Sequence, residues 1–340
     1  IDEKATTETV CLYKNLSELS KSGQFIFGHH DALAYGVGWK SIPGKSDIKE
    51  VTGDHPGLCG WDLSGIETGS VVNITGIAFA EIRQYILQGY ERGEIITCSW
   101  HMMNPATGKP AWDAKKGTLS SVLPGHEKHE AYKRWLDAAA EFMLSLKDKE
   151  GVYIPVILRL FHELNGNWFW WGGTNTTSNE FKQLWQFTVS YLRDEKNVHN
   201  VLYAFNTDIV GFDIYQQKNV SNKSFTRKLQ KDLMLLNAIA LKQNKIPALT
   251  EFGYNTIPDD TWWTQVFLKA VCKYRLAYVM AWRNSGTTEY YVPYAGQQSA
   301  DDFRSFYRSG IPLFSKETGL RQMYQLHPPL ENDRQNHEQK

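Results

Sequence analysis

Short apolar runs alternate with longer amphipathic segments along most of the chain. Eight of these runs are apolar on both faces, which is typical of strands in a parallel sheet that is buried on both sides. The predicted strands are residues 25–30, 58–63, 95–101, 154–163, 201–206, 209–215, 247–252 and 277–284. Their alternation with helical segments predicts the α/β class and a single-domain (β/α)₈ TIM barrel. A doubly wound open sheet is the alternative, but no glycine-rich phosphate loop follows the first strand.

Helical periodicity is clearest in two segments. Apolar residues recur every three or four positions from Tyr132 to Leu146, and Gly151 is expected to end this helix. The same period runs from Phe181 to Leu192, and Thr177 with Glu180 forms a capping box in front of it. Further helices are predicted at residues 75–92, 225–242 and 260–274.

The two predicted strands 201–206 and 209–215 lie almost next to each other in the sequence. Parallel neighbours require a crossover of about a dozen residues or more, and no helix fits between Asn206 and Ile209. The two strands therefore either form a tight hairpin, or a segment of the protein is missing between them. We expect the missing segment.

Charge and hydropathy narrow the class of protein. The chain has 37 Lys plus Arg and 37 Asp plus Glu, so no net field attracts nucleic acid or an anionic membrane, and neither is a predicted partner. No apolar run reaches the roughly 18 residues that a membrane span requires. The chain starts at "IDEK" with neither Met nor a signal peptide, so any targeting signal is absent from the sequence as given.

The cysteines indicate neither a metal centre nor a disulfide framework. None of them forms a CxxC pair, which disfavours zinc, although one disulfide bridge stays possible. The four are Cys11, Cys59, Cys98 and Cys272.

Polar and aromatic residues gather where the predicted strands end, which is the catalytic end of a barrel. Glu163 ends the strand 154–163, and Glu251 lies in the strand 247–252. Two carboxylates flanking a glycosidic bond cleave it, and the 12 tryptophans offer faces for sugar rings. The apolar neighbours of Glu163 favour it as the proton donor, and Glu251 suits the nucleophile, with Tyr215 as its hydrogen-bond partner. A carboxyl separation of about 5–5.5 Å would indicate retention of configuration.

A metal-dependent hydrolase is the competing interpretation of the same strand ends. His29, His30, Asp31 and His101 are residues of metal-binding types. However, the side chains of adjacent strand residues such as His29 and His30 point to opposite faces. We therefore expect no catalytic metal.

Six ordered motifs resemble those of glycoside hydrolase family 26, whose members are mostly β-mannanases. They are "FGHHDALAYGVGW", "SWHMMNP", "RLFHELNGNWFWWG", "GFDIYQ", "LTEFGY" and "MAWRNS". The resemblance extends from about residue 23 to residue 319 and leaves the polar tail 330–340 outside. The resemblance implies one catalytic barrel domain over residues 1–340. Such an enzyme hydrolyses β-1,4-mannosidic bonds in mannan, galactomannan or manno-oligosaccharides. The implied mechanism is double displacement, which retains the anomeric configuration and uses no cofactor.

The resemblance also assigns roles to residues. Glu163 would be the general acid/base and Glu251 the nucleophile. The residues expected to bind substrate are His101, His162, Trp168, Tyr215, Trp282, Arg159 and Arg283. Weaker candidates for outer subsites are His29, Trp39, Asp62 and Asn284. Of Phe169, Trp170 and Trp171, at least one or two are expected in the core.

The sequence leaves two roles open for Arg159. Its side chain could orient a carboxylate of the site, or it could form a structural ion pair inside the barrel. The chain departs from the family pattern in the short connection before "GFDIYQ".

Other functions compatible with this site are β-1,3-xylanase, mixed-linkage glucanase and a non-catalytic carbohydrate-binding barrel. The sequence leaves open whether cleavage is endo or releases mannobiose from a chain end, whether galactose branches are accepted, and the oligomeric state. From the polymeric substrate we expect a periplasmic or cell-surface bacterial enzyme, with secretion as the second choice.

Overall fold

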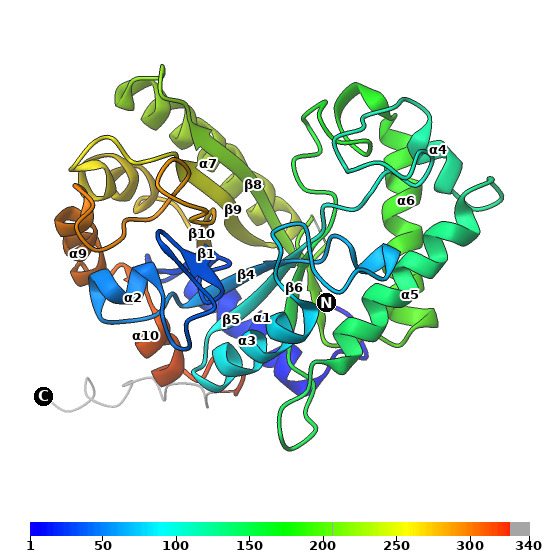
Figure 1. Cartoon of the computed structure of the whole chain (residues 1–340), viewed down its shortest axis with the longest axis horizontal. Coiled ribbons are helices and arrows are strands. Elements are labelled where there is room, and N and C mark those ends of the chain that lie inside the picture. Colours follow the sequence, from blue (N-terminus) through cyan, green and yellow to red (C-terminus); the bar gives the residue numbers. More distant parts are fainter. Residues whose placement is uncertain (206, 327–340) are drawn as a thin grey trace, which may run out of the picture.

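A curved sheet of eight parallel strands forms the centre of the computed structural model, which describes residues 1–205 and 207–326 (Figure 1). All eight predicted strands are confirmed, several with shorter bounds. They are β1 (Phe25–His30), β4 (Leu58–Asp62), β5 (Ile95–Ser99), β6 (Val156–Arg159), β7 (Val201–Tyr203), β8 (Ile209–Gln216), β9 (Ile246–Tyr254) and β10 (Tyr278–Ala281). Their order in the sheet, β7-β6-β5-β4-β1-β10-β9-β8, follows the chain order around a barrel. The predicted α/β barrel class is therefore confirmed.

Helices flank the sheet between most strands (Figure 1). The α-helices are α1 (Thr7–Leu19), α2 (Asp47–Thr52), α3 (Phe79–Glu91), α4 (Thr118–Val122), α5 (His129–Ser145), α6 (Ser178–Ser190), α7 (Asn222–Gln243), α8 (Lys269–Val271), α9 (Ala300–Arg308) and α10 (Ser315–Leu320). Smaller elements are the hairpin of β2 (Tyr35–Gly36) and β3 (Trp39–Lys40), and β11 (Pro312–Leu313) beside β1. Short 3₁₀ turns cover Ile66–Thr68 and Gly173–Asn175, and π-helical turns cover Tyr191–Glu195 and Trp262–Leu268.

The helix ends confirm one sequence prediction and correct another. In front of α6 the Thr177 hydroxyl accepts from the Glu180 N–H while the Glu180 carboxylate accepts from the Thr177 N–H, which is the predicted capping box. The prediction that Gly151 ends α5 was wrong. The chain leaves the helix at Leu146, which is extended, and Gly151 lies in a later turn.

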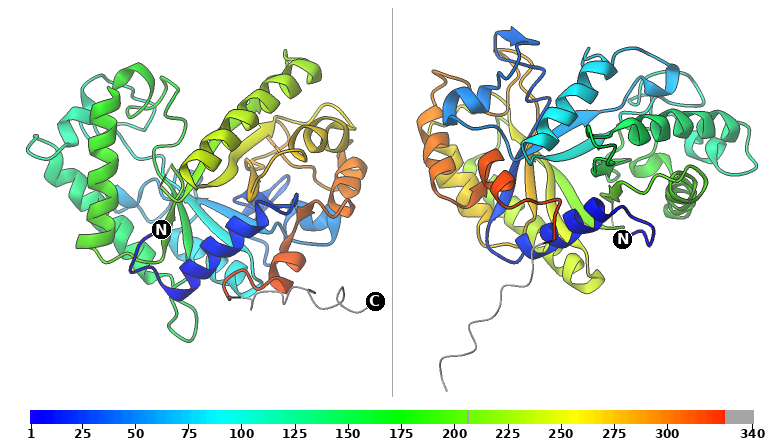
Figure 2. Two further views of the ribbon diagram at one scale, coloured as in Figure 1. Left: turned by 180° about the vertical axis from the view of Figure 1, so that it is seen from behind. Right: turned by 90° about the horizontal axis from the view of Figure 1, so that it is seen from below.

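The end of the barrel at which the strands begin is closed by α1. Leu12, Leu16 and Leu19 on this helix are buried in one apolar cluster with residues at the strand starts, such as Ile26 and Ile95. In the view from behind, α1 lies across the sheet (Figure 2). Since this end is covered, a substrate has access from the opposite end, where the strands finish.

The barrel wall has a seam between β7 and β8. Among the described residues, a single parallel bridge from Ala204 to Ile209 joins these strands. A tight hairpin would make them antiparallel, so that alternative was wrong. β8 thus starts level with the end of β7, without the helical crossover that parallel neighbours usually have.

The seam leaves apolar surface that a packed helix would normally cover. Leu235 on α7 lines the cavity beside the seam and is 60% exposed. A cavity of about 470 Å³ runs from Arg159 past the seam to Leu235. The missing segment between strands 201–206 and 209–215 therefore stays our prediction.

Intact-mass measurement of the natural protein tests this prediction. We expect a mass exceeding the 39.0 kDa of the given chain by about 2 kDa or more, since a crossover needs about a dozen residues of ~0.11 kDa each. Peptide mapping across the seam would locate the additional residues. An intact mass of 39.0 kDa would contradict the prediction.

The structure also bears on the predictions about cysteines and membrane-spanning segments. Cys11, Cys59, Cys98 and Cys272 are all free. In the part of the chain that the structure describes, none of the helices has both the length and the apolar character needed to cross a membrane. Asn206 and the tail 330–340 lie outside the described residues, and the single-domain assignment for 1–340 stays a prediction.

Candidate active site

Three carboxylates meet at the open end of the barrel. One oxygen each of Glu163, Asp213 and Glu251 lies within 4.8 Å of the other two. The register shift between Phe212 and Asp213 places Asp213 opposite Glu251 on the neighbouring strand. Adjacent anionic groups in a buried site oppose each other's ionisation, so at least one of them carries a proton more readily than a free carboxyl does.

The backbone after β6 is held in an unusual conformation where it presents Glu163. Phe161 and Glu163 have φ angles of 51° and 53°, in the left-handed region that non-glycine residues rarely adopt. Such conformations persist where the surrounding structure enforces them, and they concentrate at functional sites. Here the buried ring of Phe161 packs into the core while Glu163 lines the cavity.

Arg159 joins two of the three carboxylates. It is 2% exposed, its Nη1 donates to Asp213 at 2.7 Å, and its Nη2 donates to Glu251. The two roles left open by the sequence are thus both present, since one guanidinium orients Glu251 and forms an ion pair inside the barrel. The ion pair favours the charged form of Glu251.

Glu251 receives a second donor from β8. The Tyr215 hydroxyl donates to Oε1, while Arg159 donates to Oε2. Burial raises the pKa of Glu251 to about 7, with Arg159 and Tyr215 opposing this rise and the charges of Asp213 and Glu163 adding to it. Because both oxygens already accept hydrogen bonds, a proton on Glu251 would displace one of these donors.

Glu163 has fewer groups that stabilise its charge. Burial raises its pKa and the charge of Asp213 raises it further, while the hydrogen bond from Trp168 lowers it. Among the described residues, this bond from Trp168 Nε1 to Glu163 Oε2 is the one side-chain hydrogen bond to the Glu163 carboxylate, whereas Glu251 receives two. The hydrogen-bond donors therefore favour the ionised form of Glu251 over that of Glu163, while burial raises the pKa of both carboxyls.

The aromatic run after Glu163 divides between surface and core, as predicted. Trp168 is 49% exposed, whereas Phe169, Trp170 and Trp171 are buried. The Trp170 and Trp171 indoles donate to backbone carbonyls inside the protein. A Cβ at Gly166 would lie 2.3 Å from the Trp168 ring, so this position needs glycine for the ring to reach Glu163.

Replacing Trp168 with phenylalanine is expected to move the basic limb of the pH–activity profile to higher pH. The substitution removes the donor that lowers the pKa of Glu163, so the acid form persists to higher pH. The measurement is kcat/KM for a manno-oligosaccharide across pH. A basic limb that moves to lower pH would contradict the assignment of Glu163 as the acid.

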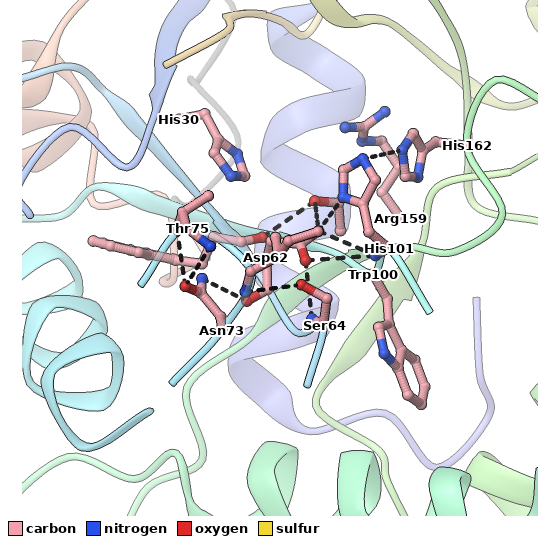
Figure 3. A network of polar contacts seen from close by, with 12 residues as sticks. His30, Asp62, Ser64, Asn73, Thr75, Trp100, His101, Arg159 and His162 are labelled. Atoms are coloured by element: carbon pink, nitrogen blue, oxygen red, sulfur yellow. Dashed lines mark hydrogen bonds and ion pairs between the residues drawn. The ribbon is translucent and has the colours of Figure 1, made fainter. Parts of the chain in front are cut away.

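Two histidines line the site beside the carboxylates. His101 and His162 follow β5 and β6, and their Nε2 atoms are 3.1 Å apart (Figure 3). Asp62, at the end of β4, accepts a hydrogen bond from His101 Nδ1 at 2.8 Å. His101 also stacks on Trp112, with ring centroids 5.2 Å apart.

Trp112 was missed by the sequence analysis. It is 49% exposed and comes from the loop between β5 and α4, not from a strand end. The available signal was a lone tryptophan in a polar loop, "KPAWDAKK". Its exposed ring beside His101 makes it a second aromatic surface for a sugar.

The last strand contributes two of the predicted residues. Trp282 stacks on His30, with ring centroids 4.4 Å apart, and lies 6.2 Å from His101. Arg283 instead contacts the Tyr35 hydroxyl at 3.3 Å and Glu289 at 3.5 Å. Trp282 thus borders the histidines, whereas Arg283 belongs to a separate ion pair on the rim.

The weaker candidates for outer subsites are buried, and their role in binding stays a prediction. Three of the four side chains form hydrogen bonds within the protein. Trp39 and Asn284 both donate to Asp47, and Asp62 accepts a hydrogen bond from His101. The four are His29, Trp39, Asp62 and Asn284.

Among the described residues, Glu163, Asp213 and Glu251 are the set with the spacing of metal ligands. Arg159 already bonds to two of them and supplies positive charge there. The set is therefore arranged around a guanidinium, and we assign it no metal.

A barrel whose strand ends bring two carboxylates together, with exposed indoles beside them, defines a glycoside hydrolase site. The sequence model for glycosyl hydrolase family 26 matches residues 1–290. The chain belongs to this family.

Solved structures of similar proteins share the fold over nearly the whole chain. A GH26 β-mannanase from Bacteroides ovatus is 41% identical with a TM-score of 0.90, covering 94% of this chain and 98% of that one. GH26C from Muricauda sp. is 32% identical with a TM-score of 0.88, covering 96% and 95%.

A mannan endo-1,4-β-mannosidase from Bifidobacterium adolescentis is 31% identical over 364 positions, which cover 94% of this chain. The chain spans 36% of the length of that relative. An alignment longer than the 340 residues of this chain requires gaps in it, which agrees with a segment missing at the seam but does not place the gaps there.

Proposed function

We propose that this protein is a retaining glycoside hydrolase that cleaves β-1,4-mannosidic bonds in mannan, galactomannan or manno-oligosaccharides. The observation that carries the proposal is the approach of Glu163 and Glu251 oxygens to within 4.8 Å. Retaining enzymes place their two carboxyl groups about 5–5.5 Å apart, whereas inverting enzymes need about 6.5–9.5 Å to admit a water molecule. The linkage specificity is supported by the relatives in the family.

The reaction follows from the protonation states of the pair. Glu251 attacks the anomeric carbon as the glycosidic C–O bond breaks, and Glu163 gives its proton to the departing oxygen. Arg159 and Tyr215 hold the attacking carboxylate in place. Glu163, now ionised, takes a proton from water, whose oxygen attacks the same carbon and releases Glu251.

The test combines a substrate panel with product stereochemistry. Reducing-sugar release is measured from β-1,4-mannan, β-1,3-xylan and mixed-linkage glucan, and the anomer formed first from mannohexaose is read by ¹H NMR. We expect activity on mannan and initial formation of the β-anomer. Preference for either other polymer would replace the substrate assignment, an initial α-anomer would overturn retention, and no release from any polymer would favour a binding barrel.

The same digestion, sampled over time, distinguishes the two modes of attack. Early products of many lengths indicate endo cleavage, which the names of the curated relatives favour. Mannobiose alone from the start indicates release from a chain end. Galactomannan in parallel measures the tolerance of galactose branches.

We also propose a periplasmic or cell-surface location in a bacterium, with secretion as the second choice. The support is the polymeric substrate, which meets the enzyme outside the cytoplasm. Cell fractionation and protease accessibility in the native host test the location. Activity confined to the cytoplasmic fraction would contradict it.

A further inference from the structure

Asp62 is a buried carboxylate at the end of β4 that contacts only protein groups. It is 0% exposed. Its Oδ1 accepts from the Ser64 N–H at 2.9 Å, and its Oδ2 accepts from the Ser99 hydroxyl at 2.8 Å. The same Oδ2 accepts from the backbone N–H and the ring Nδ1 of His101, at 3.2 and 2.8 Å (Figure 3). With these donors in place, Asp62 has no free position for a sugar hydroxyl.

The bond to Asp62 determines where His101 carries a proton. An ionised carboxylate can only accept, so His101 Nδ1 must carry hydrogen. Burial by itself would raise the pKa of Asp62, but the charge of His101 and the bonds from His101 and Ser64 lower it below the usual range. The carboxylate is therefore ionised and keeps the Nδ1–H of His101 pointed at it.

Only one hydrogen fits between the facing Nε2 atoms of His101 and His162, which are 3.1 Å apart. If His101 is an imidazolium, its Nε2–H donates and His162 keeps its proton on Nδ1. If His101 is neutral, His162 donates from Nε2 and its Nδ1 is an acceptor. The protonation of His101 thus decides whether Nδ1 of His162 donates or accepts.

His162 Nδ1 is a buried polar atom without a protein partner. The residue precedes Glu163 and lines the same cavity. Buried polar atoms are almost always satisfied, so an unpaired one on the residue next to Glu163 indicates a group that binds there. In a glycosidase the group of that chemistry is a sugar hydroxyl.

We propose that Asp62 is a positioning residue for the glycosidase reaction: it keeps His101 an imidazolium that donates to His162, so that His162 presents an Nδ1–H donor to a substrate hydroxyl. The proposal rests on the proposed function, because the hydroxyl belongs to the sugar that Glu163 and Glu251 cleave.

The surrounding charges agree with this arrangement. Burial and the charge of Arg159 lower the pKa of His101. The charge and hydrogen bond of Asp62, together with the charge of Glu251, outweigh them and raise this pKa above its usual value. For His162, burial and then the charge of His101 lower the pKa well below the usual value. The other charged or titratable groups that act on His162 are Arg159, His30 and Asp62.

A donor at this position matters because a hydroxyl has a single hydrogen. When His162 donates to the hydroxyl oxygen, that hydrogen remains free to bond a carboxylate of the site. When His162 accepts, it takes the hydrogen away. Hydrogen bonds from sugar hydroxyls that strengthen in the transition state contribute to glycosidase rates, so the donor state is the more active one.

The first experiment reads the protons directly. The full chain, labelled with ¹⁵N-histidine, is examined by two-bond ¹H–¹⁵N NMR at pH 6. We expect His101 protonated on both nitrogens and His162 neutral with its proton on Nδ1. A His162 proton on Nε2 would overturn the proposal without any variant.

The second experiment compares Asp62→Asn with the wild type. We expect kcat/KM to fall about 10- to 100-fold, with most of the loss in kcat, the range for outer-shell carboxylates that orient a ligating histidine. The basic limb should move to lower pH, because His101 loses the group that raises its pKa. A variant with an unmoved pH profile and the wild-type tautomer would contradict the proposal, since a merely structural role predicts that result.

Asp54→Asn is the matched control. Asp54 is also buried, but it accepts bonds from the backbone of His55 and Lys316, outside the active site. Its replacement should leave the tautomer and the pH profile unchanged. Wild-type release of sugar from mannan is measured first: if there is none, the proposed function fails, while the NMR experiment still decides the proton arrangement.

Discussion

Replacing Glu251 with alanine is expected to lower kcat on mannan by on the order of 10⁴-fold or more. The variant lacks the atom that forms the covalent intermediate, and loss of a nucleophile is among the largest single effects in enzymes with two-step mechanisms. The barrel should persist, because Arg159 keeps its ion pair with Asp213 at 2.7 Å. The effect should therefore appear in turnover while folding is retained.

Reducing-sugar release and far-UV circular dichroism are the measurements for this variant. Mass spectrometry of the wild type treated with a 2-fluoro-mannoside should find the sugar on the peptide containing Glu251. Glu180→Gln is the control, since this glutamate caps α6. Wild-type turnover in Glu251→Ala, or a label on another residue, would overturn the nucleophile assignment.

Replacing Glu163 with glutamine is expected to lower kcat/KM on mannan by about 10²–10⁴-fold, the range of general acid catalysis. Glutamine keeps the size of the side chain and can still accept the bond from Trp168, but it has no acidic proton. The basic limb of the pH profile should lose the contribution of Glu163, whose raised pKa helps to produce it, and keep that of His101.

The leaving group provides the control within this experiment. An aryl β-mannobioside whose phenol is strongly acidic departs without protonation, so its first step should lose much less activity in Glu163→Gln than mannan does. Pre-steady-state release of the phenol measures that step. An equal loss for both substrates would show that Glu163 acts in some other way than by proton donation.

The strands and the carboxylate pair could be predicted because both are encoded locally. Runs apolar on both faces reveal buried parallel strands, and chain order then fixes which strand ends share a rim. Glu163 and Glu251 stand at such ends, so their approach followed from the barrel itself. The bond from Tyr215 to Glu251 was predicted in the same way and is confirmed.

Features formed by turns and loops were predicted less well. The first residues of the predicted helix 75–92 form a turn instead, in which Asn73 accepts bonds from the N–H groups of Thr75 and Ile77. This local side-chain bonding competes with helix formation, and α3 begins only at Phe79. Trp112 was missed because its loop reaches the site through packing that no sequence period reports.

The sequence alone determined the class of fold, the two carboxylates and the aromatic surroundings, since periodicity and strand order are properties of the chain. Only the tertiary structure showed which carboxylate receives more hydrogen-bond donors, because Arg159 and Tyr215 come from other strands to meet Glu251. It also separated exposed Trp168 from its buried neighbours and revealed the hydrogen bond between Asp62 and His101. Burial and hydrogen-bond geometry arise from contacts between distant segments, so pKa and orientation appear only once the barrel has formed.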